Sequence, residues 1–241
     1  MRGARVEGAF PVPRSALSHR VRRFHALLPA GALAGMAGPV AFTAAWITAS
    51  LRQPGYSPTE IQISGLAAPG ARDPWIMQAG FLVLGGCLIG FGPALRHGLG
   101  GRSWKSAGRT AGGPAPWLIE AAGVLVIVAG LLRRDHMLLT PGPGSWHNQA
   151  HNAVSAVIYV LLIAIPLALA RRLHRDPDWT GLPALLVGAA AATAVILIVF
   201  SAVGANSPYA GLLQRAGVSI PLAALVALAS RLRRPASAAR S

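Results

Sequence analysis

The chain has 241 residues, of which 53% are hydrophobic and only 12% are charged. An average soluble protein is about one quarter charged, so this composition excludes an ordinary soluble domain and favours an integral membrane protein. The 22 Lys and Arg residues far outnumber the 7 Asp and Glu, but they lie in short clusters between apolar runs and accompany no nucleic-acid-binding motif, which argues against a nucleic-acid partner.

The chain begins with a basic segment, residues 1–26, that is rich in Arg, Gly, Pro and Ser. Its apolar content is too low for it to fold alone, so we predict a disordered cytoplasmic tail. A signal peptide is the alternative. The uncharged run from Leu27 to Leu51 has 25 residues, however, which is longer than the apolar core of a signal peptide.

Six apolar segments follow one another along the chain, and at 1.5 Å per residue each can cross a hydrocarbon core of about 30 Å. The uncharged stretch 179–213 is too long for one crossing, and we divide it at Asn206-Ser207-Pro208. The predicted fold is an all-α integral membrane bundle of six transmembrane helices in a domain covering 27–234, followed by a short cytoplasmic tail, 235–241. The predicted helices cover residues 28–51, 74–95, 112–132, 149–170, 181–203 and 208–230.

The distribution of Lys and Arg predicts the orientation, because these residues concentrate in cytoplasmic loops. With the N-terminus inside, the inner segments carry 17 of the 22 basic residues and the outer segments carry 5. We therefore expect a plasma-membrane protein with both termini in the cytoplasm. Its partner is the lipid bilayer, and the inner Arg clusters are expected to contact anionic lipid head groups. The motifs Gly31-x-x-x-Gly35 and Gly86-x-x-x-Gly90 favour close helix packing, inside the monomer or in an oligomer.

A polar stretch, residues 133–155, leads from the third predicted helix into the fourth. His147, His151 and Ser155 recur every four residues, so their side chains share one helix face. Asp135 and His136 lie at the start of the same stretch. The sequence therefore predicts a polar site at the outer membrane surface.

Two histidines four residues apart on a helix can bind one metal ion. The candidate metal ligands are His147, His151, Asp135 and His136, a set that suits zinc. In the outer loop between the first two helices, Ser64 and Glu60 are the candidates for a nucleophile and a general acid or base. The same side chains also fit a hydrogen-bonded network that ties helices together. The remaining members of the predicted pocket are Arg215, Asn148, Asn152 and Ser155.

Two charged groups lie inside apolar segments, where an unpaired charge is costly. Arg215, near the start of the sixth helix, is expected to pair with Asp135. Glu120 is the only acid inside an apolar run, and we expect it to reach the cytoplasmic interface or to pair with a loop arginine such as Arg109.

Four sequence stretches resemble one known family in the same order along the chain. They are Gln53-Pro54-Gly55-Tyr56-Ser57 with Ser64-Gly65-Leu66; Trp75-Ile76-Met77-Gln78; Asp135 with Ser145-Trp146-His147 and His151; and Gly211-Leu212-Leu213-Gln214-Arg215. Over residues 30–234 the chain is similar to the six-helix bacterial and archaeal membrane proteins called domain of unknown function 998. It departs from their pattern at His136, where Pro is frequent, and at Gly65, where an acid is frequent. The resemblance implies the fold and the candidate positions and names no reaction.

Three functional interpretations stay open. The leading one is a membrane protein of unestablished activity whose outer polar pocket accommodates a ligand or lipid, or is structural. The alternative is a metal-dependent intramembrane hydrolase of a lipid or amide, with His147, His151 and Asp135 as ligands. The second alternative is a small solute or proton-coupled transporter that uses Glu120 and the histidines as relay groups.

Overall fold

The computed structural model describes residues 14–99, 113–137, 144–204 and 207–233, with side chains from residue 28 onward. In these ranges the regular secondary structure is helical, joined by loops and turns, and there is no strand. The α-helices are α1 (Arg14–Arg52), α2 (Pro74–Gly98), α3 (Ala115–Leu131), α4 (Trp146–Leu173), α5 (Leu182–Val203) and α6 (Ala210–Leu232), and two short 3₁₀ helices are η1 (Ile63–Ala67) and η3 (Pro177–Trp179).

The predicted helices agree with the observed ones to within a few residues, except at the start of α1. This helix begins at Arg14, so residues 14–26, which were expected to be disordered, are helical. Arginine is a good helix former, and a helix that is already nucleated by an apolar segment can continue through such residues. The rest of the predicted N-terminal tail, residues 1–13, and nearly all of the predicted C-terminal tail lie outside the described residues.

Among the residues that the structure describes, five helices are long and apolar enough to cross a membrane: α1 from Leu28 onward, α2, α4, α5 and α6. The apolar helix α3 has 17 residues and is therefore about 26 Å long, slightly shorter than a hydrocarbon core. Large apolar side chains are exposed along these helices, among them Val160, Val195 and Ile198. Trp75 and Trp117, at the N-terminal ends of α2 and α3, are also exposed, as is usual for residues at a lipid interface. These features fit a multi-pass membrane protein.

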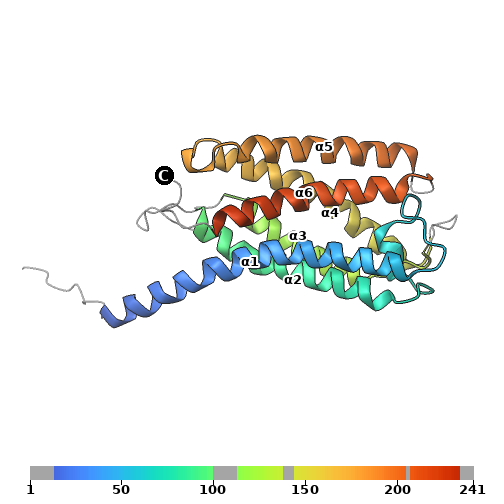
Figure 1. Ribbon diagram of the computed structural model, residues 1–241, viewed down its shortest axis with the longest axis horizontal. Helices are drawn as coiled ribbons and strands as arrows, with labels where there is room; N and C mark the ends of the chain where they lie inside the picture. Colours follow the sequence, from blue (N-terminus) through green and yellow to red (C-terminus); the bar gives the residue numbers. More distant parts are fainter. Residues whose placement is uncertain (1–13, 100–112, 138–143, 205–206, 234–241) are drawn as a thin grey trace, which may run out of the picture.

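The helices form a closed bundle in which each one packs against the next and α6 packs back against α1 (Figure 1). α1 begins and α6 ends at one end of the bundle, here called the terminal end. The connection between α1 and α2, residues 53–73, lies at the opposite end, here called the cap end, and is called the cap loop.

Glycines bring α1, α2 and α3 close together. A Cβ atom on Gly35 would lie 2.7 Å from the Phe91 ring, and one on Gly85 would lie 2.5 Å from the carbonyl oxygen of Gly123. By contrast, a Cβ on Gly86 would meet nothing within 4 Å. The motif Gly31-x-x-x-Gly35 therefore contributes to helix packing inside the monomer. Gly86, from the second motif, faces away from the other helices.

Candidate functional site

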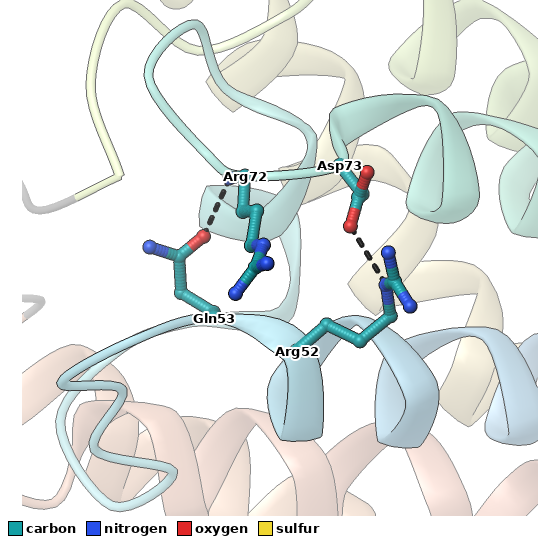
Figure 2. A network of polar contacts seen from close by, with 4 residues as sticks. All are labelled: Arg52, Gln53, Arg72 and Asp73. Carbon is teal, nitrogen blue, oxygen red and sulfur yellow. Dashed lines mark hydrogen bonds and ion pairs between the residues drawn. The ribbon is translucent and has the colours of Figure 1, made fainter.

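The cap loop is closed at its base by two contacts between its ends (Figure 2). Arg52 Nε, in the last residue of α1, lies 2.7 Å from Asp73 Oδ2, directly before α2. The backbone N–H of Arg72 donates a hydrogen bond of 2.7 Å to Gln53 Oε1. Because these contacts tie the two ends of the cap loop together, ordering the loop costs less conformational entropy.

The middle of the cap loop is buried in the bundle. Every residue from 61 to 68 is buried, including all of η1. Ile61, Ile63 and Leu66 supply the apolar side chains that make this burial favourable. The loop thus closes the cap end of the bundle with side chains of its own.

Arg215 holds the cap loop onto α6. Its side chain is 7% exposed, and Nη1 donates hydrogen bonds to the carbonyl oxygens of Pro58 (2.7 Å) and Ile61 (2.8 Å). Nη2 donates to the Tyr56 hydroxyl, and the guanidinium also lies 5.3 Å from the centre of the Trp46 ring. The expected ion pair with Asp135 is wrong, because buried loop carbonyls take the place of a carboxylate.

Two glycines allow the cap loop to lie so close. A Cβ on Gly211 would be 2.5 Å from the Ile61 carbonyl oxygen and 2.7 Å from that of Pro58. A Cβ on Gly65 would collide with the carbonyl oxygen of Met137. Gly65, where the resembled family often carries an acid, therefore allows η1 to pack against the segment that follows α3.

Below the cap loop, the bundle contains a partly open cavity of about 100 Å³. All six helices and η1 contribute side chains to its wall. Its lining residues on α4 run from His151 to Leu169, which corresponds to about 27 Å along the helix. Most of the wall is apolar, including Phe81, Leu162 and Leu225, so the cavity suits a hydrophobic occupant.

The exceptions gather at the cap end of this cavity, where the lining includes the five side chains here called the polar end: Ser64, His151, Ser155, Tyr159 and Gln214. Gln214 joins two parts of it, because its Oε1 accepts a hydrogen bond of 2.7 Å from the Ile63 N–H and its Nε2 donates one of 2.8 Å to the Tyr159 hydroxyl oxygen. Gln214 and Arg215 are adjacent in α6, and both bind the backbone of the cap loop: Gln214 accepts from an N–H group and Arg215 donates to carbonyl oxygens.

His151 is 4% exposed, and its imidazole is fixed by the end of α3. Its Nδ1 lies 2.9 Å from the carbonyl oxygen of Ala129 and 2.6 Å from that of Leu132. A carbonyl oxygen can only accept, so Nδ1 must carry the hydrogen. The carbonyl groups at the end of α3, which lack helical partners, are satisfied in this way.

A second polar group lies where α3 connects to α4. Arg134 is 2% exposed, and its Nη1 donates to Gln62 Oε1 at 3.2 Å. Burial lowers the pKa of the Arg134 guanidinium below its ordinary value, and the interaction with Tyr159 partly offsets this. Arg134 therefore connects the segment after α3 to the cap loop as a buried cation.

Asp135 organises the start of α4. Its carboxylate accepts hydrogen bonds from the Ser145 hydroxyl and, at 2.6 Å, from the Ser145 N–H. Both donors favour the charged form and hold the pKa of Asp135 below its ordinary value. The Ser145 hydroxyl oxygen also accepts a bond of 3.3 Å from the Asn148 N–H and caps the helix.

The predicted site residues separate into two groups. His151, Ser155 and Ser64 line the cavity. His147, His136, Asn152 and Glu60 are exposed, and the His147 ring stacks on Trp146 with 3.6 Å between ring centres. In the part of the chain that the structure describes, no group of three His, Cys, Asp or Glu side chains is arranged to hold a metal ion, so the geometry lends no support to the predicted zinc ligand set.

Glu120 lies near the terminal end, away from the cavity lining. Its Oε1 is 2.7 Å from Arg96 Nη1, and the Arg96 guanidinium lies 4.4 Å from the centre of the Trp117 ring. A Cβ on Gly92 would collide with the Glu120 carboxylate, so this glycine makes room for the ion pair. The partner is Arg96 of α2, whereas the expected Arg109 lies outside the described residues.

Sequence reasoning missed Tyr159, Gln214 and Arg134 as members of the site. Tyr159 follows His151 by eight residues and continues the helix face of His151 and Ser155, so periodicity alone could have found it. Gln214 belongs to the stretch Gly211-Leu212-Leu213-Gln214-Arg215 that carries the family resemblance, but that stretch does not indicate a position in the cavity wall. Nothing in the sequence indicated that Arg134, in a loop, would be buried.

Comparison with known proteins identifies the family. A family model described as "Protein of unknown function (DUF998)" matches residues 36–231, from within α1 to the last turn of α6. Neither a curated protein nor a solved structure matched the chain. Because the family match covers most of the chain, the protein belongs to the DUF998 family.

Proposed function

We propose that this protein is a six-span membrane protein that accommodates one lipid-like hydrocarbon chain in its central cavity. The observation that carries the proposal is the combination of an apolar cavity wall with a polar end beneath the cap loop, which Arg215 and Gln214 hold in place. The hydrocarbon chain of one bilayer leaflet is about 15 Å long, half of the hydrocarbon core. The cavity of about 100 Å³ has room for only a few carbon atoms of such a chain. We therefore propose that the head-group end of the chain enters the cavity and that the rest lies in the open part of the pocket, along the lining residues of α4, which extend over about 27 Å.

Hydrophobic burial drives binding only for a hydrocarbon chain that comes from water. A chain that leaves water for this wall gains about 0.8 kcal/mol for each buried CH₂ group, whereas a chain that leaves the bilayer gains little. Selectivity must therefore come from the fit of the cavity and from its polar end. This is typical of ligand sites, which combine an apolar wall with a few polar groups.

The proposal includes six membrane crossings, with α3 as the shortest, and a cytoplasmic terminal end in the plasma membrane. Two observations support this orientation: α1 begins and α6 ends at the same end of the bundle, and Arg171, Arg175 and Arg233 are exposed there. Exposed arginines beside a membrane attract anionic lipid head groups, which we propose as secondary partners of the terminal end.

A photoreactive hydrocarbon tests the cavity. The purified protein in lipid nanodiscs is mixed with a long-chain alcohol that carries a diazirine at its tail end, irradiated and mapped by peptide mass spectrometry. We expect saturable labelling near Leu169 and Leu225 of the lining, which excess unlabelled alcohol removes. Labelling confined to lipid-exposed positions such as Val160 and Val195 would contradict the proposal.

A further inference from the structure

The donors and acceptors at the polar end of the cavity are specific enough to indicate the head group of the occupant. Within the described part of the chain, the lining contains no Asp, Glu, Lys or Arg side chain. A head group in this position would therefore contact only uncharged groups and histidine. The buried Arg134 cation interacts with Tyr159 of the polar end although it is not part of the lining, so the choice of head group rests on the hydrogen-bonding groups and not on charge.

His151 offers the occupant an acceptor. Its Nδ1 is directed at the carbonyl oxygens of Ala129 and Leu132 and carries the hydrogen, so the neutral ring presents the lone pair of Nε2. Among the described residues, no group donates a hydrogen bond to Nε2, although the imidazole lines the cavity. Nε2 is thus the ring nitrogen left for an occupant that can donate.

Tyr159 offers a donor two helical turns further along the same face. Its hydroxyl oxygen accepts from Gln214 Nε2 at 2.8 Å, which leaves the hydroxyl hydrogen available. Ser155 lies between the two residues on the same face of α4, and it also lines the cavity. Along one face of α4, the polar end therefore presents the acceptor of His151, the Ser155 hydroxyl, which can donate or accept, and the Tyr159 hydroxyl as a donor.

We infer that the occupant is a hydroxyl-terminated hydrocarbon chain, a long-chain alcohol, whose hydroxyl donates to His151 Nε2 and accepts from Ser155, one helical turn away on the same face. An ether or ester lacks the hydrogen for Nε2, and a carboxylate only accepts. This inference rests on the proposed cavity function and adds the chemical class of the ligand.

The test compares three tail-labelled diazirine probes with the same chain: the alcohol, its methyl ether and the matching carboxylate. The readout is the concentration that gives half-maximal labelling near Leu169 and Leu225. We expect the alcohol to bind about tenfold more tightly than the ether, since the ether leaves a buried acceptor unsatisfied. Equal binding of alcohol and ether, or tightest binding of the carboxylate, would overturn the alcohol inference and leave the cavity function intact. If none of the probes labels the lining, the cavity function itself fails.

Two substitutions assign the contact. His151→Asn keeps an N–H near the position of Nδ1 for the α3 carbonyls but removes Nε2, and Ser155→Ala removes only the adjacent hydroxyl. His151→Asn should abolish the preference for alcohol over ether without weakening ether binding. The control is Thr193→Val, because Thr193 is fully buried and lies outside the cavity lining. An unchanged preference in both His151→Asn and Ser155→Ala would refute the assignment, and loss of preference in Thr193→Val as well would show a merely structural effect.

Discussion

At the scale of single residues, the cap end depends on side chains that hydrogen-bond to backbone groups. Arg215 and Gln214 together satisfy two carbonyl groups, one N–H group and two tyrosine hydroxyls. These contacts replace the water that a loop would ordinarily bind. A loop that is satisfied in this way can lie buried above an apolar cavity.

Arg215→Lys should destabilise the protein by about 3 kcal/mol, because a lysine ammonium cannot reproduce the several directed bonds of the guanidinium. Thermal unfolding in detergent, followed by circular dichroism, measures the change. Arg133→Lys is the matched control, since Arg133 is exposed next to the buried Arg134. Equal stability of the two variants would show that Arg215 does not hold the cap loop.

The Asp135 carboxylate should make the start of α4 sensitive to acid. Its pKa in the folded protein lies below the ordinary value of 3.8, so its stabilising effect is complete above that value and is lost as the pH falls through the lower, folded pKa. Between neutral pH and about pH 3, wild type should lose more stability than Asp135→Asn. Parallel pH profiles of the two proteins would argue against this role.

At the scale of elements, the helices were predictable because their signal is local. Uncharged runs of sufficient length gave the positions of α2, α5 and α6 to within a few residues. The Ser145 cap explains why α4 begins at Trp146, a few residues before the predicted start at residue 149. The cap loop was not predictable in the same way. Its burial depends on contacts with Gln214 and Arg215, about 150 residues away in the sequence, and no local pattern encodes such contacts.

The predicted metal site likewise depended on contacts that a local sequence pattern does not reveal. The spacing of His147 and His151 correctly places both on α4, but spacing does not reveal which face meets the bundle. The structure turns His151 inward and leaves His147 exposed. Two residues one helical turn apart can differ in burial in this way when the first turn of the helix extends past the helices it packs against.

Close contact between α2 and α3 also gives a prediction. A Cβ on Gly123 would lie 2.6 Å from the Gly85 carbonyl oxygen and 3.0 Å from the Ile89 nitrogen, and backbone atoms cannot move aside without separating the helices. Gly123→Ala should therefore cost about 1–3 kcal/mol of stability. Gly86→Ala, on the open side of α2, should be neutral or stabilising. Thermal unfolding of both variants checks this, and a stable Gly123→Ala protein would contradict the packing.

At the scale of the whole molecule, the asymmetry of the two ends predicts orientation. In a Cys87→Ser background, Glu60→Cys places a thiol in the cap loop and His174→Cys places one after α4; both positions are exposed. A membrane-impermeant maleimide should label Glu60→Cys in intact cells and His174→Cys only after permeabilisation. The reverse pattern would invert the proposed topology.

The central claim is that the bundle holds a hydrocarbon chain between its helices. Its most direct measurement is the lipid that stays bound during purification, quantified by native mass spectrometry in wild type, Ala122→Phe and Ala121→Phe. Ala122 lines the cavity and is 4% exposed, whereas its neighbour Ala121 is exposed on the outside of α3. We predict one bound chain per protein in wild type and in Ala121→Phe, and almost none in Ala122→Phe, where the phenyl ring fills the cavity. Equal lipid in all three proteins, or no lipid in wild type, would contradict the account.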